Sequence, residues 1–215
     1  MAENAAAPLL VEYLEAFRRG DDLEAFRRNV EARYTEGTLC RILRSGRPEA
    51  RRASVLALGL FGTFESNRAV GESLKDPDPI VRNQATQALW SIWFRADTPD
   101  HNAQLAEVRA LIGRNRAREA EAAATRLIDR APGFAEAYNQ RAIARFALGK
   151  FAECAGDCRM VLQKNRYHFG ALDGLTRCYL ELGQRPEALE TCRRALKLQP
   201  YNDGLRQLVA ILEAE

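Results

Sequence analysis

Side chains that could carry out chemistry are few in this chain of 215 residues, which has five cysteines and two histidines. Cys154 and Cys158 stand one helical turn apart, and with Cys178 and His168 they could supply four zinc ligands, because thiolates at this spacing on a helix can chelate. In the alternative interpretation, which we favour, the cysteines are packing residues. The histidines, His101 and His168, are interpreted as surface or capping residues.

Catalytic signatures are missing from the sequence. We find no glycine-rich phosphate loop, no paired-histidine zinc motif and no nucleophile elbow. The sequence therefore predicts no catalytic residue, no metal, no cofactor and no enzymatic activity.

Arginines are locally dense, although the formal net charge is only +3. Five of them fall close together: Arg41, Arg44, Arg47, Arg51 and Arg52. Guanidinium groups suit phosphates, so this cluster could bind nucleic acid with strongly salt-dependent affinity. Acidic residues such as Glu36 and Glu49 are interleaved with it, which favours a solvated charged face.

Residues of similar type recur at a constant spacing in the carboxyl-terminal half of the chain, for example at Tyr138 and Leu172. This repeat indicates which elements position the side chains. Six positions hold a small or apolar residue in both copies. The first copy has Tyr138, Gly149, Cys154, Cys158, Val161 and Leu162, and the second has, in the same order, Leu172, Gly183, Ala188, Cys192, Ala195 and Leu196. A weaker third copy precedes them at Ala120, Leu127 and Ile128. A fixed period of this length is typical of stacked helical hairpins, which present an extended binding surface.

This half of the chain resembles the tetratricopeptide repeat family. The matching residues are Tyr138, Ala142, Gly149, Ala188, Ala195 and Pro200, and the departures are Cys154, Arg166 and Thr176. The resemblance implies three repeats within residues 99–202, at 101–134, 135–168 and 169–202. Gly149 and Gly183 suit the left-handed turn inside each hairpin. Leu205, Leu208 and Leu212 predict a C-terminal capping helix over 203–215.

The amino-terminal half has a second, shorter period, the interval from Pro48 to Pro79. At this interval Pro48, Arg51, Ser54, Ala57 and Leu58 are followed by Pro79, Arg82, Ala85, Ala88 and Leu89. The stretch from Asp76 to Arg82 resembles the short bacterial form of the HEAT repeat, with Asp78 capping a helix that starts at Pro79. We expect HEAT-like repeats over 21–98 after an N-terminal capping helix over 1–20. The predicted fold class is all-α, an α-solenoid of helical hairpins.

The tetratricopeptide resemblance also implies a binding groove, lined by the first helix of each hairpin. The predicted groove residues are Arg109, Glu136, Asn139, Ile143, Phe146, Asp173 and Arg177. Asn139 could bond a peptide backbone, the arginines could hold carboxylates, and Ile143 and Phe146 could bury an apolar side chain. The residues expected for the clamp that binds chaperone tails are not at the corresponding positions, so we expect a different ligand.

The leading hypothesis is a non-enzymatic scaffold that binds a short peptide or helix of a partner protein in this groove. The alternative is a nucleic-acid-binding accessory protein that uses the cluster from Arg41 to Arg52. A third hypothesis is a lyase or assembly factor resembling the HEAT-like phycobilin lyases. No apolar run is long enough to span a bilayer and no signal peptide is apparent, so we expect a cytoplasmic protein without a membrane partner.

Overall fold

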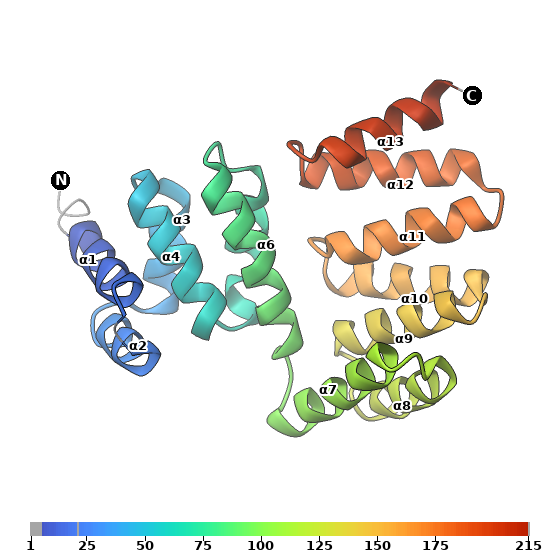
Figure 1. Ribbon diagram of the computed structural model, residues 1–215, viewed down its shortest axis with the longest axis horizontal. Coiled ribbons are helices and arrows are strands. Elements are labelled where there is room, and N and C mark those ends of the chain that lie inside the picture. Colours follow the sequence, from blue (N-terminus) through green and yellow to red (C-terminus); the bar gives the residue numbers. More distant parts are fainter. Residues whose placement is uncertain (1–5, 21, 215) are drawn as a thin grey trace. The chain divides into compact units, whose positions relative to one another are not determined.

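The computed structural model describes residues 6–20 and 22–214, and it is all-helical, with no strand in these ranges (Figure 1). The chain forms two compact units, residues 1–93 and residues 94–215. The boundary between them falls near the end of one helix, α6 (Pro79–Phe94). None of the helices in the described ranges has the length and apolar character needed to cross a membrane.

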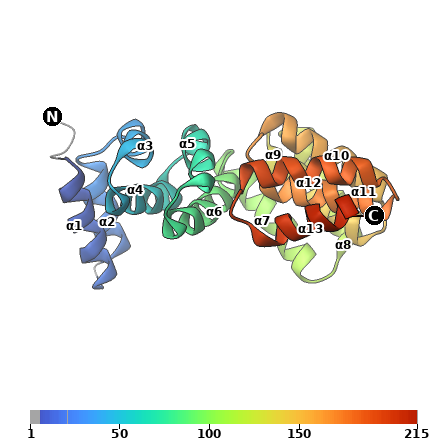
Figure 2. The same ribbon diagram turned by 90° about the horizontal axis from the view of Figure 1, so that it is seen from above.

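Unit 1 contains the helices seen most clearly in Figure 2. Their bounds are α1 Ala6–Arg18, α2 Leu23–Glu31, α3 Glu36–Ser45, α4 Pro48–Phe61, α5 Asn67–Glu72 and α6 Pro79–Phe94, with short 3₁₀ turns at Phe64–Ser66 (η2) and Ser73–Lys75 (η3). The two prolines that define the shorter period, Pro48 and Pro79, each begin a helix. Proline suits this position because its fixed φ is helical and its missing N–H would have no intrahelical partner.

Two close contacts hold the helices of unit 1 together. Gly59 of α4 lies against Ala88 of α6 so tightly that a Cβ atom on Gly59 would approach the Ala88 Cβ to 2.9 Å. Trp93 of α6 donates a buried hydrogen bond from Nε1 to Oδ1 of Asn67 on α5 at 2.7 Å. Leucine, valine and alanine side chains form most of the buried apolar core of this unit.

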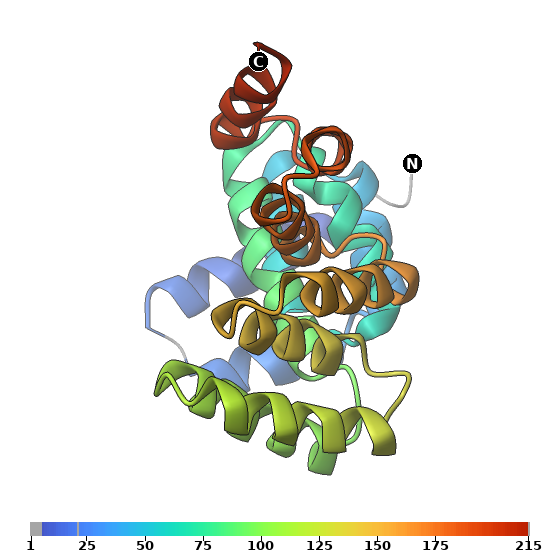
Figure 3. The same cartoon turned by 90° about the vertical axis from the view of Figure 1, so that its right-hand side faces the viewer.

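Unit 2 stacks its helices in chain order, from the green hairpin to the red terminal helix (Figure 3). Their bounds are α7 Pro99–Gly113, α8 Ala117–Arg130, α9 Ala135–Ala147, α10 Phe151–Lys164, α11 Phe169–Glu181, α12 Arg185–Leu198 and α13 Asp203–Ala214. Each of the three hairpins packs against the next, because α8 contacts α9 and α10 contacts α11. The terminal helix α13 packs on α12 and covers Ala188 and Cys192 with Leu205, Leu208, Val209 and Leu212.

The turn inside each hairpin has the same geometry. Asn115, Gly149 and Gly183 occupy the same position in successive repeats, and their φ angles are 57°, 72° and 70°. After each of them, a backbone N–H bonds to the carbonyl five residues earlier: Arg116 to Leu111, Lys150 to Arg145 and Gln184 to Tyr179. This pattern closes the end of a helix with a left-handed residue. The predicted turn glycines are therefore confirmed, and Asn115 completes the series.

Candidate partner-binding site

Two of the predicted groove residues lie in the interior of unit 2. Glu136 and Asn139, both on α9, are only 1% and 3% exposed. Oε1 of Glu136 accepts hydrogen bonds from Asn139 Nδ2 at 2.8 Å and from Gln140 Nε2 at 2.7 Å. Its Oε2 accepts from His168 Nε2 at 2.9 Å. The structure therefore contradicts the prediction that Glu136 and Asn139 face a bound peptide, because both side chains are buried and hydrogen-bonded to interior partners.

The same contacts define the role of His168. Its Nδ1 accepts a hydrogen bond from the backbone N–H of Ala171 at 2.9 Å, so Nε2 carries the proton that is donated to Glu136. His168 is thus the N-cap of α11, as its interpretation as a capping residue anticipated, but it is fully buried instead of lying on the surface. It joins the start of α11 to a carboxylate on α9.

Four of the remaining groove residues, Arg109, Ile143, Asp173 and Arg177, are exposed on one surface, which we call the first-helix face. Contacts between α7 and α9 and between α9 and α11 bring the first helices of the three hairpins side by side. Arg109, Ile143 and Arg177 occupy the same position in successive repeats, and all three are exposed. They form a row that presents one aliphatic side chain between two cations.

Each arginine of this row already has a partner. The guanidinium carbon of Arg109 lies 3.6 Å from the centroid of the Phe94 ring. Arg177 Nε lies 3.0 Å from Oδ2 of Asp173, and both side chains are more than half exposed. A cation on an aromatic face or in an exposed ion pair keeps its charge and can still bind a carboxylate. The geometry therefore leaves Arg109, Asp173 and Arg177 accessible.

A second row on the first-helix face is apolar. Ile112 and Phe146 are half-buried, whereas Leu180 in the third repeat is 38% exposed. Phe146 packs edge-to-face on Phe151 with ring centroids 5.2 Å apart. Phe146 thus contributes mainly to the core, and Ile143 and Leu180 are the apolar side chains that a partner can reach.

A cavity of about 620 Å³ opens next to this face. It lies between the α7–α8 turn and the C-terminal half of α9. The lining residues are Ile112, Asn115, Arg116, Ala117, Arg118, Glu119, Ile143, Ala144, Ala147 and Leu148. The predicted groove residue Ile143 therefore contributes to the cavity as well as to the exposed row.

A network of ion pairs fixes the middle hairpin. Asp157 of α10, which is buried, accepts two hydrogen bonds from Arg141 and one from Arg145, all at 2.7 to 3.0 Å. Arg145 also bonds to Glu121 of α8 at 3.0 Å, and Lys150 bonds to the same carboxylate at 2.7 Å. These contacts join three consecutive helices, so they hold α9 and its exposed residues in a defined position.

The cysteines of unit 2 are packing residues. Cys154, Cys158 and Cys178 are buried in one apolar cluster with Ala142 and Leu175. Hydrogen bonding to Cys154 and Cys178, together with burial, raises the pKa of Cys158, which keeps this thiol protonated. Within the described ranges no group of three or more histidine, cysteine or acidic side chains could hold a metal ion. This finding contradicts the zinc interpretation, in which three of these thiols and His168 supply the ligands.

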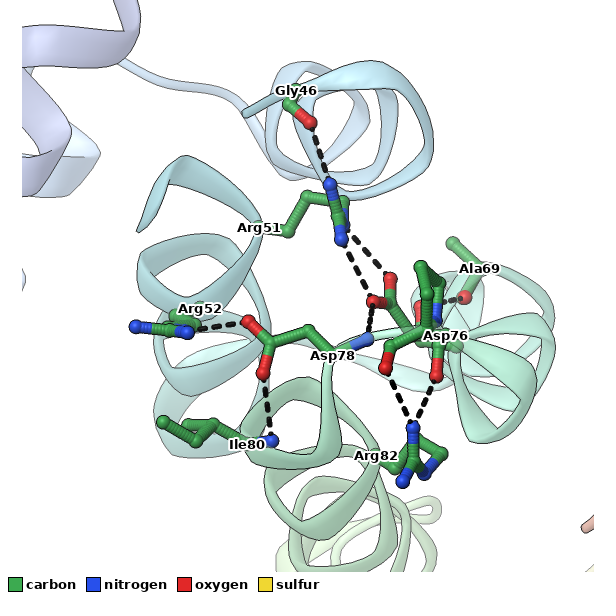
Figure 4. Close-up of polar contacts among 10 residues, drawn as sticks. Gly46, Arg51, Arg52, Ala69, Asp76, Asp78, Ile80 and Arg82 are labelled. Carbon is green, nitrogen blue, oxygen red and sulfur yellow. Dashed lines mark hydrogen bonds and ion pairs between the residues drawn. The ribbon is translucent and has the colours of Figure 1, made fainter. Parts of the chain in front are cut away.

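The arginines between residues 41 and 52 do not act as one free basic patch (Figure 4). Arg51 forms two hydrogen bonds of 2.8 Å to the carboxylate of Asp76 and one of 2.9 Å to the carbonyl of Gly46. Arg52 bonds to Asp78 at 2.6 Å. Because these contacts connect α4 to the segment before α6, Arg51 and Arg52 stabilise the fold of unit 1, and their charges are neutralised there.

The other three arginines of that cluster are exposed on unit 1. Arg44 lies 3.7 Å from Glu72, whereas Arg41 and Arg47 belong to α3 and to the α3–α4 link.

Asp78 caps α6 as predicted, since its Oδ1 accepts a hydrogen bond from the Ile80 N–H at 2.9 Å. Burial alone would raise the pKa of Asp78, but hydrogen bonds from Arg52 and Ile80 outweigh it and lower the pKa.

Comparisons with known proteins agree with this geometry. The sequence profile of HEAT repeats matches residues 35–129, which extends into the hairpin α7–α8. A TPR repeat-containing protein from Rhizobium etli is 30% identical over 81 residues, 38% of this chain and 40% of that relative. The protein is a HEAT- and tetratricopeptide-like repeat protein. The repeat protein thus spans less than half of the length of the curated relative that it matches.

A solved structure supports the same fold. The TPR2AB domain in the pHSP90 complex of yeast Sti1 is similar to the repeat protein over 99% of this chain and 97% of that chain, with a TM-score of 0.50 and 20% identity. The all-α repeat fold is therefore confirmed. Repeats of these two types typically build scaffolds, because their products are extended surfaces instead of deep catalytic pockets.

Sequence reasoning missed several residues that shape the site. Asn115 was overlooked as a turn residue, although it stands one repeat period before Gly149 and could have been found from that phase. Gln140 and the ion-pair network around Asp157 carried no comparable signal. The partners of Asp157 lie on a different helix, so only the packed structure brings them together.

Proposed function

We propose that the protein is a non-enzymatic scaffold that binds a short segment or helix of a partner protein on its first-helix face. The observation that carries this proposal is the row of Arg109, Ile143 and Arg177, which stays exposed at one repeat position. The position just before it is buried in all three repeats, at Val108, Ala142 and Thr176. Ile143 is 41% exposed and Leu180 is 38% exposed on the same face. Apolar side chains between charged ones are typical of surfaces that bind proteins.

The expected affinity follows from the size of the face. Three first helices offer two reachable apolar side chains and three reachable charges, which is a small surface. A dissociation constant near micromolar, corresponding to about −8 kcal/mol, is the expected range. Such binding suits a scaffold whose partners exchange.

The proposed location is the cytoplasm. All five cysteines lie within the described ranges, and all are free thiols. Free thiols are usual in reducing compartments. This supports the location independently of the function.

A peptide-display selection on the full chain tests the binding proposal. Peptides that bind the wild-type protein should lose at least about tenfold in affinity when Ile143→Asp places a carboxylate in the exposed row. The matched control is Ile211→Asp, at an aliphatic residue of α13 that is 56% exposed and lies outside the first-helix face.

Two results would contradict the proposal. One is a selection that yields no peptide above background. The other is a set of selected peptides whose affinity falls equally in Ile143→Asp and Ile211→Asp, since the effect would then not depend on the first-helix face.

A further inference from the structure

We propose that the cavity beside the α7–α8 turn is an anchor pocket for one aliphatic side chain of the partner segment, and that acidic residues flank this side chain in the partner. The inference rests on the proposed function and specifies its ligand. The cavity is defined by its own residues, most of which lie outside the exposed row of Arg109, Ile143 and Arg177.

More than half of the residues that line the pocket are apolar. Ile112, Ile143, Ala144, Ala147 and Leu148 contribute aliphatic surface from α7 and α9 and from the residue after α9. Its volume of about 620 Å³ lies within the range of about 300 to 1,000 Å³ that is usual for binding pockets. Burial of an aliphatic side chain there would remove apolar surface from water on both partners, which is favourable.

The rim of the pocket is basic. Arg116 and Arg118 line it, and Arg114 adjoins it in the α7–α8 turn. Glu119 neutralises only Arg116, to which it is hydrogen-bonded. Among the described residues, neither Arg114 nor Arg118 forms an ion pair or a side-chain hydrogen bond. Charge complementarity therefore favours a segment that carries carboxylates next to its aliphatic residue.

Among the three hairpins, only the first has both Arg114 and Arg118 at these positions beside the pocket. In the second and third repeats, the position of Arg118 is taken by Ala152 and Pro186, and that of Arg114 by Leu148 and Leu182. The other two hairpins therefore lack the two arginines at these positions. An acidic segment should therefore bind with its acidic part at the first hairpin.

The wall of the pocket is preformed. Asn115 holds the turn in a left-handed conformation with a φ angle of 57°, and the Arg116 N–H closes it on the Leu111 carbonyl at 2.9 Å. The Arg145 contacts to Glu121 and Asp157 hold α9, which supplies three of the lining residues. A site that needs little rearrangement loses less of its binding energy to ordering.

Fluorescence anisotropy with synthetic peptides tests the pocket. The probe is a short fluorescein-labelled peptide with one leucine between pairs of glutamates and glycine–serine ends. Its comparison peptides carry serine in place of the leucine, or lysines in place of the glutamates. The wild-type protein should bind the first peptide at least about tenfold more tightly than either comparison peptide.

Two variants of the full chain locate the binding. Ala147→Tyr places a bulky ring in the cavity and should weaken the acidic leucine peptide at least about tenfold. Its control is Glu181→Tyr, at the equivalent exposed position of the next repeat. Arg118→Glu should weaken the acidic peptide about threefold to fivefold and strengthen the lysine peptide, since an exposed charge pair contributes modestly. Its control is Arg194→Glu, at an exposed arginine of α12.

The outcomes separate this inference from the proposed function. Equal effects of Ala147→Tyr and Glu181→Tyr, or equal binding of the glutamate and lysine peptides, would overturn the anchor pocket. If peptides from the display selection are sensitive to Ile143→Asp but not to Ala147→Tyr or Arg118→Glu, the pocket is overturned and the first-helix face stands. If no displayed peptide binds the protein, both proposals fail.

Discussion

Glu136 accepts three hydrogen bonds although it is buried, and this makes it a critical side chain of unit 2. Two donors come from its own helix, Asn139 and Gln140, and the third is His168 at the start of α11. A buried carboxylate that lost a donor would keep the desolvation penalty without its compensation. The pair formed by Glu136 and His168 therefore ties the second hairpin to the third.

Replacement of His168 should separate its two roles. His168→Ala removes the N-cap of α11 and a hydrogen bond to a buried carboxylate, so the free energy of unfolding should fall by about 3 kcal/mol. His168→Asn keeps a cap and should recover about 1 kcal/mol of that loss. Asn202, at the equivalent position before α13, already acts as a cap by accepting from the Leu205 N–H at 3.1 Å.

Urea denaturation followed by circular dichroism measures both variants. Equal stabilities of His168→Ala and His168→Asn would show that the side chain does not act as a cap. If His168→Ala lowers the free energy of unfolding by less than about 1 kcal/mol, the hydrogen bond from His168 is not needed to stabilise the buried Glu136 carboxylate.

Glu121 should make stability depend on pH. The hydrogen bond from Lys150, joined by that from Arg145, lowers the pKa of Glu121 despite its burial. A group whose pKa is lower in the folded state stabilises the protein above its unfolded pKa, about 4.3 for glutamate, and loses this effect as the pH falls further. Glu121→Gln should therefore be less stable than wild type by about 1 kcal/mol at neutral pH.

The difference between wild type and Glu121→Gln should shrink as the pH falls from about 5 to about 3. Parallel urea titrations across that range measure it. The comparison with wild type cancels the contribution of carboxylates that the substitution does not affect. A difference that stays constant with pH would contradict the assigned role.

At the scale of elements, the turns of unit 2 depend on three left-handed residues. A side chain with a Cβ atom is strained at positive φ, and glycine is not. Gly149 and Gly183 avoid this strain, and asparagine is the other residue that commonly accepts it, as at Asn115. The helix ends are thus set by local backbone chemistry.

Two glycine-to-alanine substitutions should have opposite effects. Gly149→Ala places a Cβ atom at a φ of 72° and should destabilise unit 2 by about 1 to 2 kcal/mol. Gly156→Ala lies inside α10 with no atom within 4 Å of the added Cβ, and it should stabilise by about 1 kcal/mol. Chemical denaturation compares the two, and effects of the same sign would contradict this account of the turn.

Helices and turns were predictable from the sequence, because proline at a helix start, glycine at a turn and apolar spacing all act locally. Pro79 begins α6, and Gly149 closes the turn that follows α9, for these reasons. The burial of Glu136 could not be predicted in this way, because its partner His168 is distant in the sequence and belongs to another hairpin. The repeat pattern alone marked Glu136 and Asn139 as accessible.

At the scale of the whole molecule, each unit has its own buried interior and its own repeat spacing. Unit 1 repeats an arginine contact: Arg51 bonds to the carbonyl of Gly46, and Arg82, at the equivalent position of the next repeat, bonds to that of Pro77 at 2.9 Å. From the sequence, Arg51 is predicted only as part of a possible basic patch, and both arginines only as equivalent repeat positions. Their structural role depends on carbonyl groups whose direction the sequence does not reveal.

The terminal helix α13 should protect Cys192. Burial, with a smaller contribution from Asp173, raises the pKa of this thiol, and α13 covers it. Leu212→Asp puts a charge into the contact between α12 and α13, so Cys192 should react with maleimide at least about tenfold faster than in wild type. Mass spectrometry identifies the labelled cysteine.

Ile211→Asp is the matched control, because Ile211 is exposed on the same helix. It should leave the labelling rate of Cys192 unchanged. Equal acceleration by both variants, or by neither, would show that α13 does not act as the cover.

The hydrogen bonds that close the hairpins of unit 2 join backbone atoms, and they recur at Arg116, Lys150 and Gln184 whatever the side chain. Most outward-facing residues can therefore be exchanged by mutation while the architecture persists. Selection can alter which protein is recognised without having to rebuild the fold, and descendants of one ancestral array can diverge in partner while keeping the same skeleton.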